Sequence, residues 1–251
     1  MRTLIVLMLA WFAGSASAQD NRKTLVLSGT IDGKYAIHAV LDVDKPVAGG
    51  NEVTGAYFYA SRAIALPAFG TLGPQSLKLE TTTSPPELFE ATRSGDTFTG
   101  TWAQKGKRLP FVLTLQNAAA KDLAGDFKCS ASAKAPNPKL GPDTAELKFK
   151  LAQGKISGFN MSGSNAYYHT CDTELDKGDR DSVRDEGNSL AYIVQHKDAG
   201  KATCGFKFTR VADYLLVRNT TFEGCQCGAR MPGHNSVLLN TKTGKCSIYG
   251  G

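Results

Sequence analysis

The chain has 251 residues, of which 41% are hydrophobic and 21% are charged. This composition is typical of a globular protein and excludes wholesale disorder. The formal net charge of +6 arises from 29 Lys and Arg against 23 Asp and Glu, an excess too small for an obligate nucleic-acid-binding protein, whose basic residues are concentrated in a stripe.

Residues 1–18 have the pattern of a secretory signal peptide. Arg2 precedes the apolar run Leu4–Phe12, and small residues follow up to Ala16-Ser17-Ala18. A charged start, a short apolar run and an Ala-x-Ala site are the parts of such a signal, whereas a membrane anchor needs about 20 apolar residues. We therefore expect cleavage after Ala18, a periplasmic or secreted location and no transmembrane segment in the mature chain.

Residues 19–120 are predicted to form an N-terminal β module. Apolar and polar residues alternate in short runs such as Tyr35–Val43, Leu77–Glu80 and Leu109–Leu115, and a period of two indicates half-buried antiparallel strands. Turns rich in glycine and proline separate the runs. About eight strands at hairpin spacing favour a meandering barrel or a sandwich.

Two aromatic motifs lie in this module. Gly55-Ala56-Tyr57-Phe58-Tyr59 and Gly100-Thr101-Trp102 resemble segments of exported bacterial proteins of unknown activity, whose modules carry a Gly-x-Tyr-x-Tyr strand and a later Gly-Thr-Trp. The pair Gly-Thr also recurs at Gly29-Thr30 and Gly70-Thr71 beside strand-like runs. Because aromatic residues on strands usually pack in a core, we interpret the motifs as core elements.

Residues 121–143 are predicted to be a linker, because small residues and prolines occur there without a sustained apolar period. A C-terminal β module over residues 144–251 begins with the alternating run Ala145–Leu151. Its further strands are expected over Ile156–Met161, Leu190–Gln195, Cys204–Phe208, Tyr214–Val217, Ser236–Leu239 and Cys246–Tyr249. One short helix is expected within Thr173–Glu186. The predicted fold class is all-β, with two mainly antiparallel modules (barrel or sandwich), the second disulfide-bonded.

All the cysteines lie in the second half of the chain, and their number is even. They are Cys129, Cys171, Cys204, Cys225, Cys227 and Cys246. Export predicts that they form three disulfides. Cys225 and Cys227 are too close to join without strain, so the favoured pairing links them to Cys204 and Cys246 and leaves Cys129 with Cys171. The alternative is a zinc site of Cys225, Cys227, His234 and Cys246, which the ligand spacing disfavours.

The run Asp172–Glu186 contains seven acidic and three basic residues. Calcium needs several carboxylate and carbonyl oxygens around one tight turn. The residues that could supply them are Asp176, Gly178, Asp179 and Asp181. Lys177 and Arg180 lie inside the run and the order departs from the EF-hand pattern, so a solvated loop is favoured.

The sequence contains none of the common catalytic motifs, such as a nucleophile elbow, a His-Glu-x-x-His pair or a phosphate-binding glycine loop. His169 and Cys171 would share one face of a strand, but a nucleophilic Cys–His pair needs a free thiol, which an even cysteine count disfavours. We therefore expect no catalytic residue, cofactor or metal. The enzymatic alternative is a small extracytoplasmic hydrolase of envelope material that uses His169 with a nearby carboxylate.

Two loops near the C-terminus carry the candidate partner-binding residues. The segments Cys227-Gly228-Ala229-Arg230-Met231 and Thr241-Lys242-Thr243-Gly244 resemble the Ser-Gly-x-x-Tyr and Thr-Lys-Gly loops of periplasmic C-type lysozyme inhibitors, small β-barrels whose loops enter the lysozyme cleft. Cysteine and methionine replace the serine and tyrosine, and Thr243 separates Lys242 from Gly244. The resemblance therefore implies only Arg230 and Lys242 as candidate contacts with a partner.

Residues 188–251 carry eight Lys and Arg against three Asp and Glu, so an electropositive surface for acidic glycans, anionic lipid or nucleic acid is a further candidate. Its basic residues are spread over several expected strands and turns. The favoured prediction is an exported, non-enzymatic binding or inhibitor protein that recognises an envelope protein or glycan, or a lytic enzyme such as lysozyme, and no nucleic acid. A structural envelope protein is the remaining alternative.

Overall fold

The computed structural model describes residues 23–134, 139, 141–164, 170–173, 175, 178–197, 203–220 and 236–248. Within these ranges the chain forms strands and one turn of 3-10 helix, η1 (Ala120–Asp122). The all-β prediction is confirmed. None of the helices in the described ranges has the length and apolar character needed to cross a membrane.

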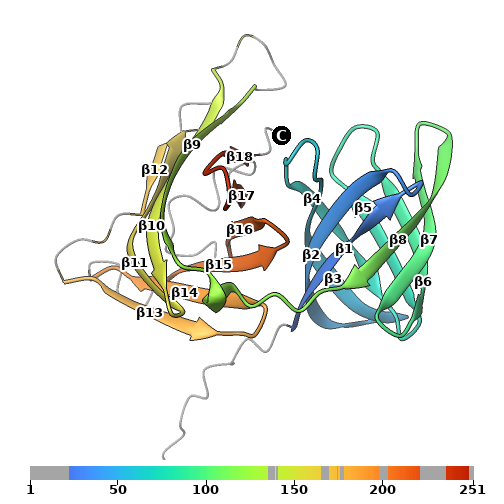
Figure 1. The fold of residues 1–251 in the computed structure, drawn as a ribbon, viewed down its shortest axis with the longest axis horizontal. Coiled ribbons are helices and arrows are strands. Elements are labelled where there is room, and N and C mark those ends of the chain that lie inside the picture. Colours follow the sequence, from blue (N-terminus) through green and yellow to red (C-terminus); the bar gives the residue numbers. More distant parts are fainter. Residues whose placement is uncertain are drawn as a thin grey trace, which may run out of the picture.

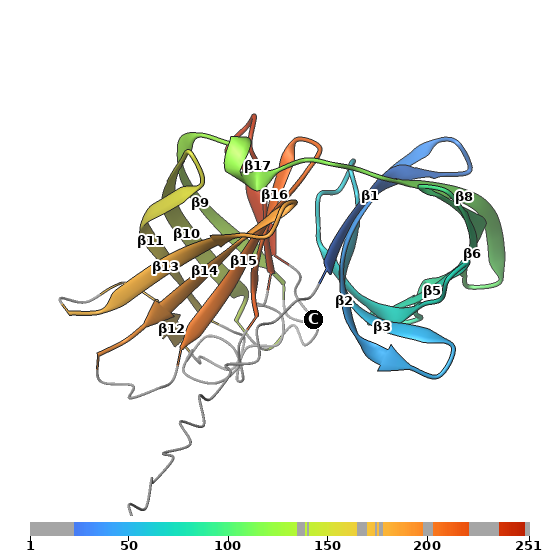
Figure 2. The same ribbon diagram turned by 90° about the horizontal axis from the view of Figure 1, so that it is seen from below.

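The first module is a closed antiparallel barrel, which Figure 2 shows as a ring. Its strands are β1 (Lys23–Ile31), β2 (Tyr35–Val47), β3 (Gly50–Tyr59), β4 (Leu66–Leu72), β5 (Ser76–Thr81), β6 (Leu88–Ser94), β7 (Thr97–Gln104) and β8 (Lys107–Leu115). Each strand pairs with the next, and β1 pairs with β8 to close the barrel. Because side chains alternate between the two faces of a strand, the apolar series of the sequence fills the interior, for example with Leu41, Phe98 and Phe111.

The repeated Gly-Thr pairs mark places where barrel strands approach closely. A Cβ atom on Gly29, Gly70 or Gly100 would lie 1.8, 1.9 or 1.9 Å, respectively, from a carbonyl oxygen of the neighbouring strand. Glycine is therefore required at these inward-facing positions, where it permits the sheet to curve. The repeat has a structural origin in barrel closure.

The second module contains two antiparallel sheets that face each other (Figures 1 and 2). The four-stranded sheet has the order β12-β11-β10-β9 and consists of β9 (Gly125–Ala133), β10 (Asp143–Ala152), β11 (Lys155–Ser164) and β12 (Thr170–Asp172). The six-stranded sheet follows chain order and consists of β13 (Arg180–Asp185), β14 (Ser189–Gln195), β15 (Cys204–Val211), β16 (Tyr214–Asn219), β17 (Ser236–Asn240) and β18 (Cys246–Ile248). A single core lies between the sheets, where Phe159 of β11 contacts Tyr192 and Phe206.

A disulfide between Cys129 and Cys246 joins the adjacent edge strands β9 and β18, with the two Cα atoms 5.9 Å apart. Cys204 is disulfide-bonded as well. The predicted pairing is wrong for Cys129 and Cys246, because their strands meet only in the tertiary structure, across 117 residues of sequence. This bond also removes Cys246 from the alternative zinc site. Cys225, Cys227 and His234 lie outside the described residues, as does the side chain of Cys171.

Two segments differ from the prediction. Strand β9 lies inside the expected linker over 121–143, because Cys129 and Ala131 alternate with exposed residues and face the core. Small inward residues gave this strand a weak apolar signal. Strand β13 lies within Thr173–Glu186, where a helix was expected, and its six residues pair with β14. Only Val183 of this edge strand packs partly against the core, so the sequence shows no apolar alternation there.

The two modules pack against each other through the outer face of β1–β3 and the face of β15–β17 that points away from the second core. The apolar cluster between them consists of Val26, Val40, Ala56, Phe58, Ala65, Val211, Tyr214, Leu216 and Leu238. The Tyr214 hydroxyl also donates to the carbonyl oxygen of Ala60 at 3.0 Å. Strand β2 is therefore buried on both faces over its central part, with Leu41 facing the barrel core and Val40 the other module.

Candidate partner-binding surface

Lys242, one of the two expected contact residues, lies in the turn between β17 and β18. Its Nζ is 2.8 Å from Asp213 Oδ2, and both side chains are exposed. The backbone N–H groups of Lys242 and Thr243 donate to Asn240 Oδ1, each at 3.0 Å, which fixes the turn. A partner carboxylate would therefore compete with Asp213 for this ammonium group. Arg230 lies outside the described residues.

The acidic run does not assemble a cation site in the part of the chain that is described, which holds no group of three or more metal-binding side chains. Asp179 accepts the backbone N–H of Lys197 at 2.9 Å and lies 2.7 Å from His196 Nδ1. Asp181 accepts the hydroxyl of Tyr192 at 2.9 Å. Asp179 and Asp181 therefore each bind other groups of the protein, and these contacts share no partner. His169 and Asp176 are outside the described residues.

A buried carboxylate that the sequence analysis missed lies inside the barrel. Glu87, in the connection between β5 and β6, is 5% exposed. Its Oε2 accepts hydrogen bonds from the hydroxyls of Tyr57 and Tyr59, the latter at 3.0 Å, and from Trp102 Nε1 at 2.6 Å. Both aromatic motifs of the sequence therefore meet at one atom. Burial and the nearby carboxylate raise the pKa of Tyr57, and they raise that of Tyr59 to about 12.

A second buried carboxylate lies between the modules. Asp42 of β2 is 4% exposed and accepts hydrogen bonds from Thr24 Oγ1 at 2.7 Å, Lys207 Nζ at 3.1 Å and Arg218 Nη2 at 2.6 Å. Burial alone would raise the pKa of Asp42, but the charges of Arg218 and Lys207 outweigh it and lower the pKa. Lys207 also pairs with Glu186 at 3.2 Å. This group is enclosed by both modules, so it forms a charged part of their interface.

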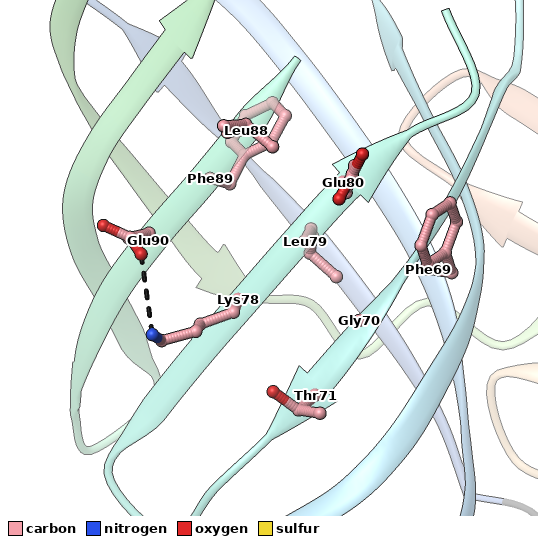
Figure 3. A pocket seen from close by; sticks show the side chains of 9 residues that line it. All are labelled: Phe69, Gly70, Thr71, Lys78, Leu79, Glu80, Leu88, Phe89 and Glu90. Atoms are coloured by element: carbon pink, nitrogen blue, oxygen red, sulfur yellow. Dashed lines mark ion pairs between the residues drawn. The ribbon is translucent and has the colours of Figure 1, made fainter. Parts of the chain in front are cut away.

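The accessible candidate is a shallow pocket of about 230 Å³ on the outside of the barrel, over β4, β5 and β6 (Figure 3). Phe69, Glu80 and Leu88 occupy the same register position on the three strands and form a row across them. Phe69 is 45% exposed and Leu88 is 43% exposed. We call these three residues the β4–β6 row.

The next row of the pocket is polar and paired within itself. Lys78 Nζ lies 3.5 Å from Glu90 Oε1, the ion pair drawn in Figure 3. Glu80, in contrast, has no ion-pair partner among the residues that the structure describes. The β4–β6 row thus combines two exposed apolar side chains with an uncompensated negative charge between them.

The β4–β6 row was not identified from the sequence, although one signal for it is present. Leu88 and Phe89 are adjacent apolar residues, and neighbouring residues of a strand point to opposite faces. Because Phe89 packs in the barrel core, Leu88 must face outward. The same reasoning applies to Phe69, which lies between the inward positions Ala68 and Gly70.

No family model, curated protein or solved structure matches this chain. The function is therefore inferred from the geometry of this surface.

Proposed function

We propose that this chain is an exported, non-enzymatic binding protein that captures and inhibits a lytic enzyme such as a C-type lysozyme, and that the β4–β6 row is its contact surface. The observation that carries the proposal is the exposure of Phe69 and Leu88 on either side of Glu80. Exposed aromatic and large apolar side chains in a shallow concavity are typical anchors of protein interfaces.

The scaffold under this row is suited to binding. The row lies on three neighbouring barrel strands that are each paired on both sides, so little backbone entropy is lost when a partner binds. On the inner side of the same strands, Leu79 and Phe89 pack in the barrel core. A rigid row of side chains presents its contacts in one geometry, as tight inhibitors require.

The charge of the row agrees with a cationic enzyme as partner. Lys78 and Glu90 neutralise each other, so Glu80 leaves the pocket with a net negative charge. Complementary charge steers association and selects against anionic partners. The local negative charge would offset the repulsion that the overall positive charge of the chain exerts on a basic lysozyme.

The test is inhibition of a purified C-type lysozyme, measured by lysis of cell walls, together with calorimetric titration. The double variant Phe69→Ser, Leu88→Ser is expected to weaken binding at least about tenfold, since each anchor contributes about 1 kcal/mol or more. Val112→Ser is the matched control, because Val112 is 40% exposed on the outer face of the same barrel. Absence of inhibition by the unsubstituted protein would overturn the proposed activity.

The variant Lys242→Glu tests the competing surface in the same assay. Loss of inhibition in Lys242→Glu, with retention in the double variant, would move the contact surface to the turn between β17 and β18. Cell-wall lysis by the protein in the absence of lysozyme would contradict the non-enzymatic part of the proposal and favour the hydrolase alternative.

A further inference from the structure

The β4–β6 row contains enough chemical detail to specify the group that enters it. Neighbouring strands lie about 4.8 Å apart, so Phe69 and Leu88, which are separated by one strand, lie about 10 Å apart with Glu80 between them. The opening is wide enough for one long side chain lying flat across β5. Figure 3 shows the ring of Phe69 and the side chains of Glu80 and Leu88 at one end of the pocket.

The charge of Glu80 restricts the occupant. A partner that covered Phe69 and Leu88 with apolar groups alone would remove water from a carboxylate that has no ion-pair partner among the described residues. Burying such a group without compensation is unfavourable. An anionic group would be repelled. The occupant must therefore bring a donor or a positive charge to Glu80 while it covers two apolar side chains.

An arginine side chain meets both requirements. Its guanidinium group is planar, stacks on aromatic rings and donates paired hydrogen bonds to a carboxylate, so it can contact Phe69 and Glu80 at the same time. Its three methylene groups can cover Leu88. A lysine ammonium group is a compact, strongly hydrated charge and lacks the planar face. The arrangement of ring, carboxylate and aliphatic side chain thus favours arginine.

We infer that the β4–β6 row is a receptor for an arginine side chain on the surface of a protein partner. This inference rests on the proposed function for the identity of that partner, but the recognition chemistry can be tested without it. The guanidinium group would stack on Phe69 and pair with Glu80, and its stem would lie against Leu88. Lys78 would remain paired with Glu90 beside it.

The experiment titrates the full mature chain with a hexa-arginine peptide and follows backbone amide signals by NMR. A hexa-citrulline peptide is the probe control, because citrulline keeps the planar shape and loses the charge. We expect saturable shifts at Phe69, Glu80 and Leu88 with the arginine peptide and little binding of the citrulline peptide. Glu80→Gln should weaken arginine binding about fivefold, the size expected for an exposed ion pair.

Asp96→Asn is the matched charge control, because Asp96 is an exposed acidic residue in the turn between β6 and β7, outside the pocket. It should change the dissociation constant less than twofold. Equal binding of the two peptides, or equal effects of Glu80→Gln and Asp96→Asn, would overturn the inference. These outcomes can be distinguished from those of the lysozyme assay. Specific arginine binding without lysozyme inhibition would reject the proposed partner. Inhibition that depends on Phe69 and Leu88 but not on Glu80 would reject the arginine receptor.

Discussion

Two of the buried carboxylates, Glu87 and Asp42, are stabilised by opposite means. Inside the barrel, Glu87 receives its hydrogen bonds from the neutral groups of Tyr57, Tyr59 and Trp102. Between the modules, Asp42 is bound by the cations Lys207 and Arg218. The first arrangement is made within one module and the second spans both.

This difference has a consequence for the assembly of the fold. The donors to Glu87 lie 15 to 30 residues away in the sequence, and the barrel alone brings them together. The cations at Asp42 are 165 and 176 residues away, so Asp42 gains its charged partners only when the modules dock. Undocked modules would expose all three charges to water, which solvates them well. The charged partners of Asp42 thus come from the other module, whereas the neutral partners of Glu87 come from the barrel itself.

The largest expected effect follows from removal of the interface carboxylate. Among the described residues, Asp42→Asn leaves only Glu186 to compensate the neighbouring charges of Lys207 and Arg218. Loss of one partner from a buried ion pair costs about 3–5 kcal/mol. Urea denaturation should show this loss, or a separate early transition as the modules part. Asp32→Asn removes the exposed partner of Lys34 and should cost less than about 1 kcal/mol. Similar values for both variants would show that the interface does not depend on charge.

A smaller effect is expected in the barrel. In Glu87→Gln the amide oxygen can still accept hydrogen bonds from Tyr57 and Trp102, but without a negative charge, so the expected loss of stability is about 1–2 kcal/mol. In protein produced from residue 19 onward, Trp102 is the single tryptophan, so its fluorescence reports on this site directly. Glu90→Gln, at an exposed position of β6, is the control and should change neither stability nor emission. If Glu87→Gln lowered the free energy of unfolding as much as Asp42→Asn does, neutral and charged partners would stabilise a buried carboxylate equally.

Most of the barrel could be predicted from the sequence because its strands have one buried face. Alternation in Leu109–Leu115 places Phe111 and Leu113 in the core, as the structure confirms. The same rule fails where a second layer covers the strand. Asp42 occupies one of the polar positions in the alternating pattern of β2, and Lys207 belongs to the basic segment that was a candidate electropositive surface. Both residues are nevertheless buried. A local pattern contains no information about which face a distant module covers.

The candidate surface was harder to predict for a related reason. Exposed apolar residues are of the same types as core residues. Only the face of the strand to which each position points distinguishes Leu88 from Phe89. The pairing of Cys129 with Cys246 likewise depends on how two edge strands meet. The C-terminal loops were predicted from resemblance, and of their two candidate residues only Lys242 lies in the described part of the chain.

The smallest expected effect concerns His38, which lies at the same module boundary as Asp42 but is stabilised in its neutral form. Its ring centroid is 5.1 Å from that of Phe58 and 6.0 Å from that of Tyr214, and its Nδ1 is 2.8 Å from Ser28 Oγ. Burial lowers the pKa of His38 below its ordinary value of 6.5, although the charge of Asp213 opposes this. As the pH falls through 6.5, the unfolded chain therefore takes up a proton before the folded chain does, and stability decreases.

The urea midpoint of the unsubstituted protein should thus be lower at pH 5.0 than at pH 7.5, and His38→Gln should reduce this difference. The imidazole of His38 lies at the boundary between the modules. If Asp42→Asn separates the modules, His38→Gln should therefore no longer change the pH dependence of the urea midpoint in that background. An unchanged pH dependence in His38→Gln would mean that the proton is taken up elsewhere. Persistence of the His38 effect after separation would mean that the barrel alone buries the imidazole, and the boundary would then depend on Asp42 and its cations without a contribution from His38.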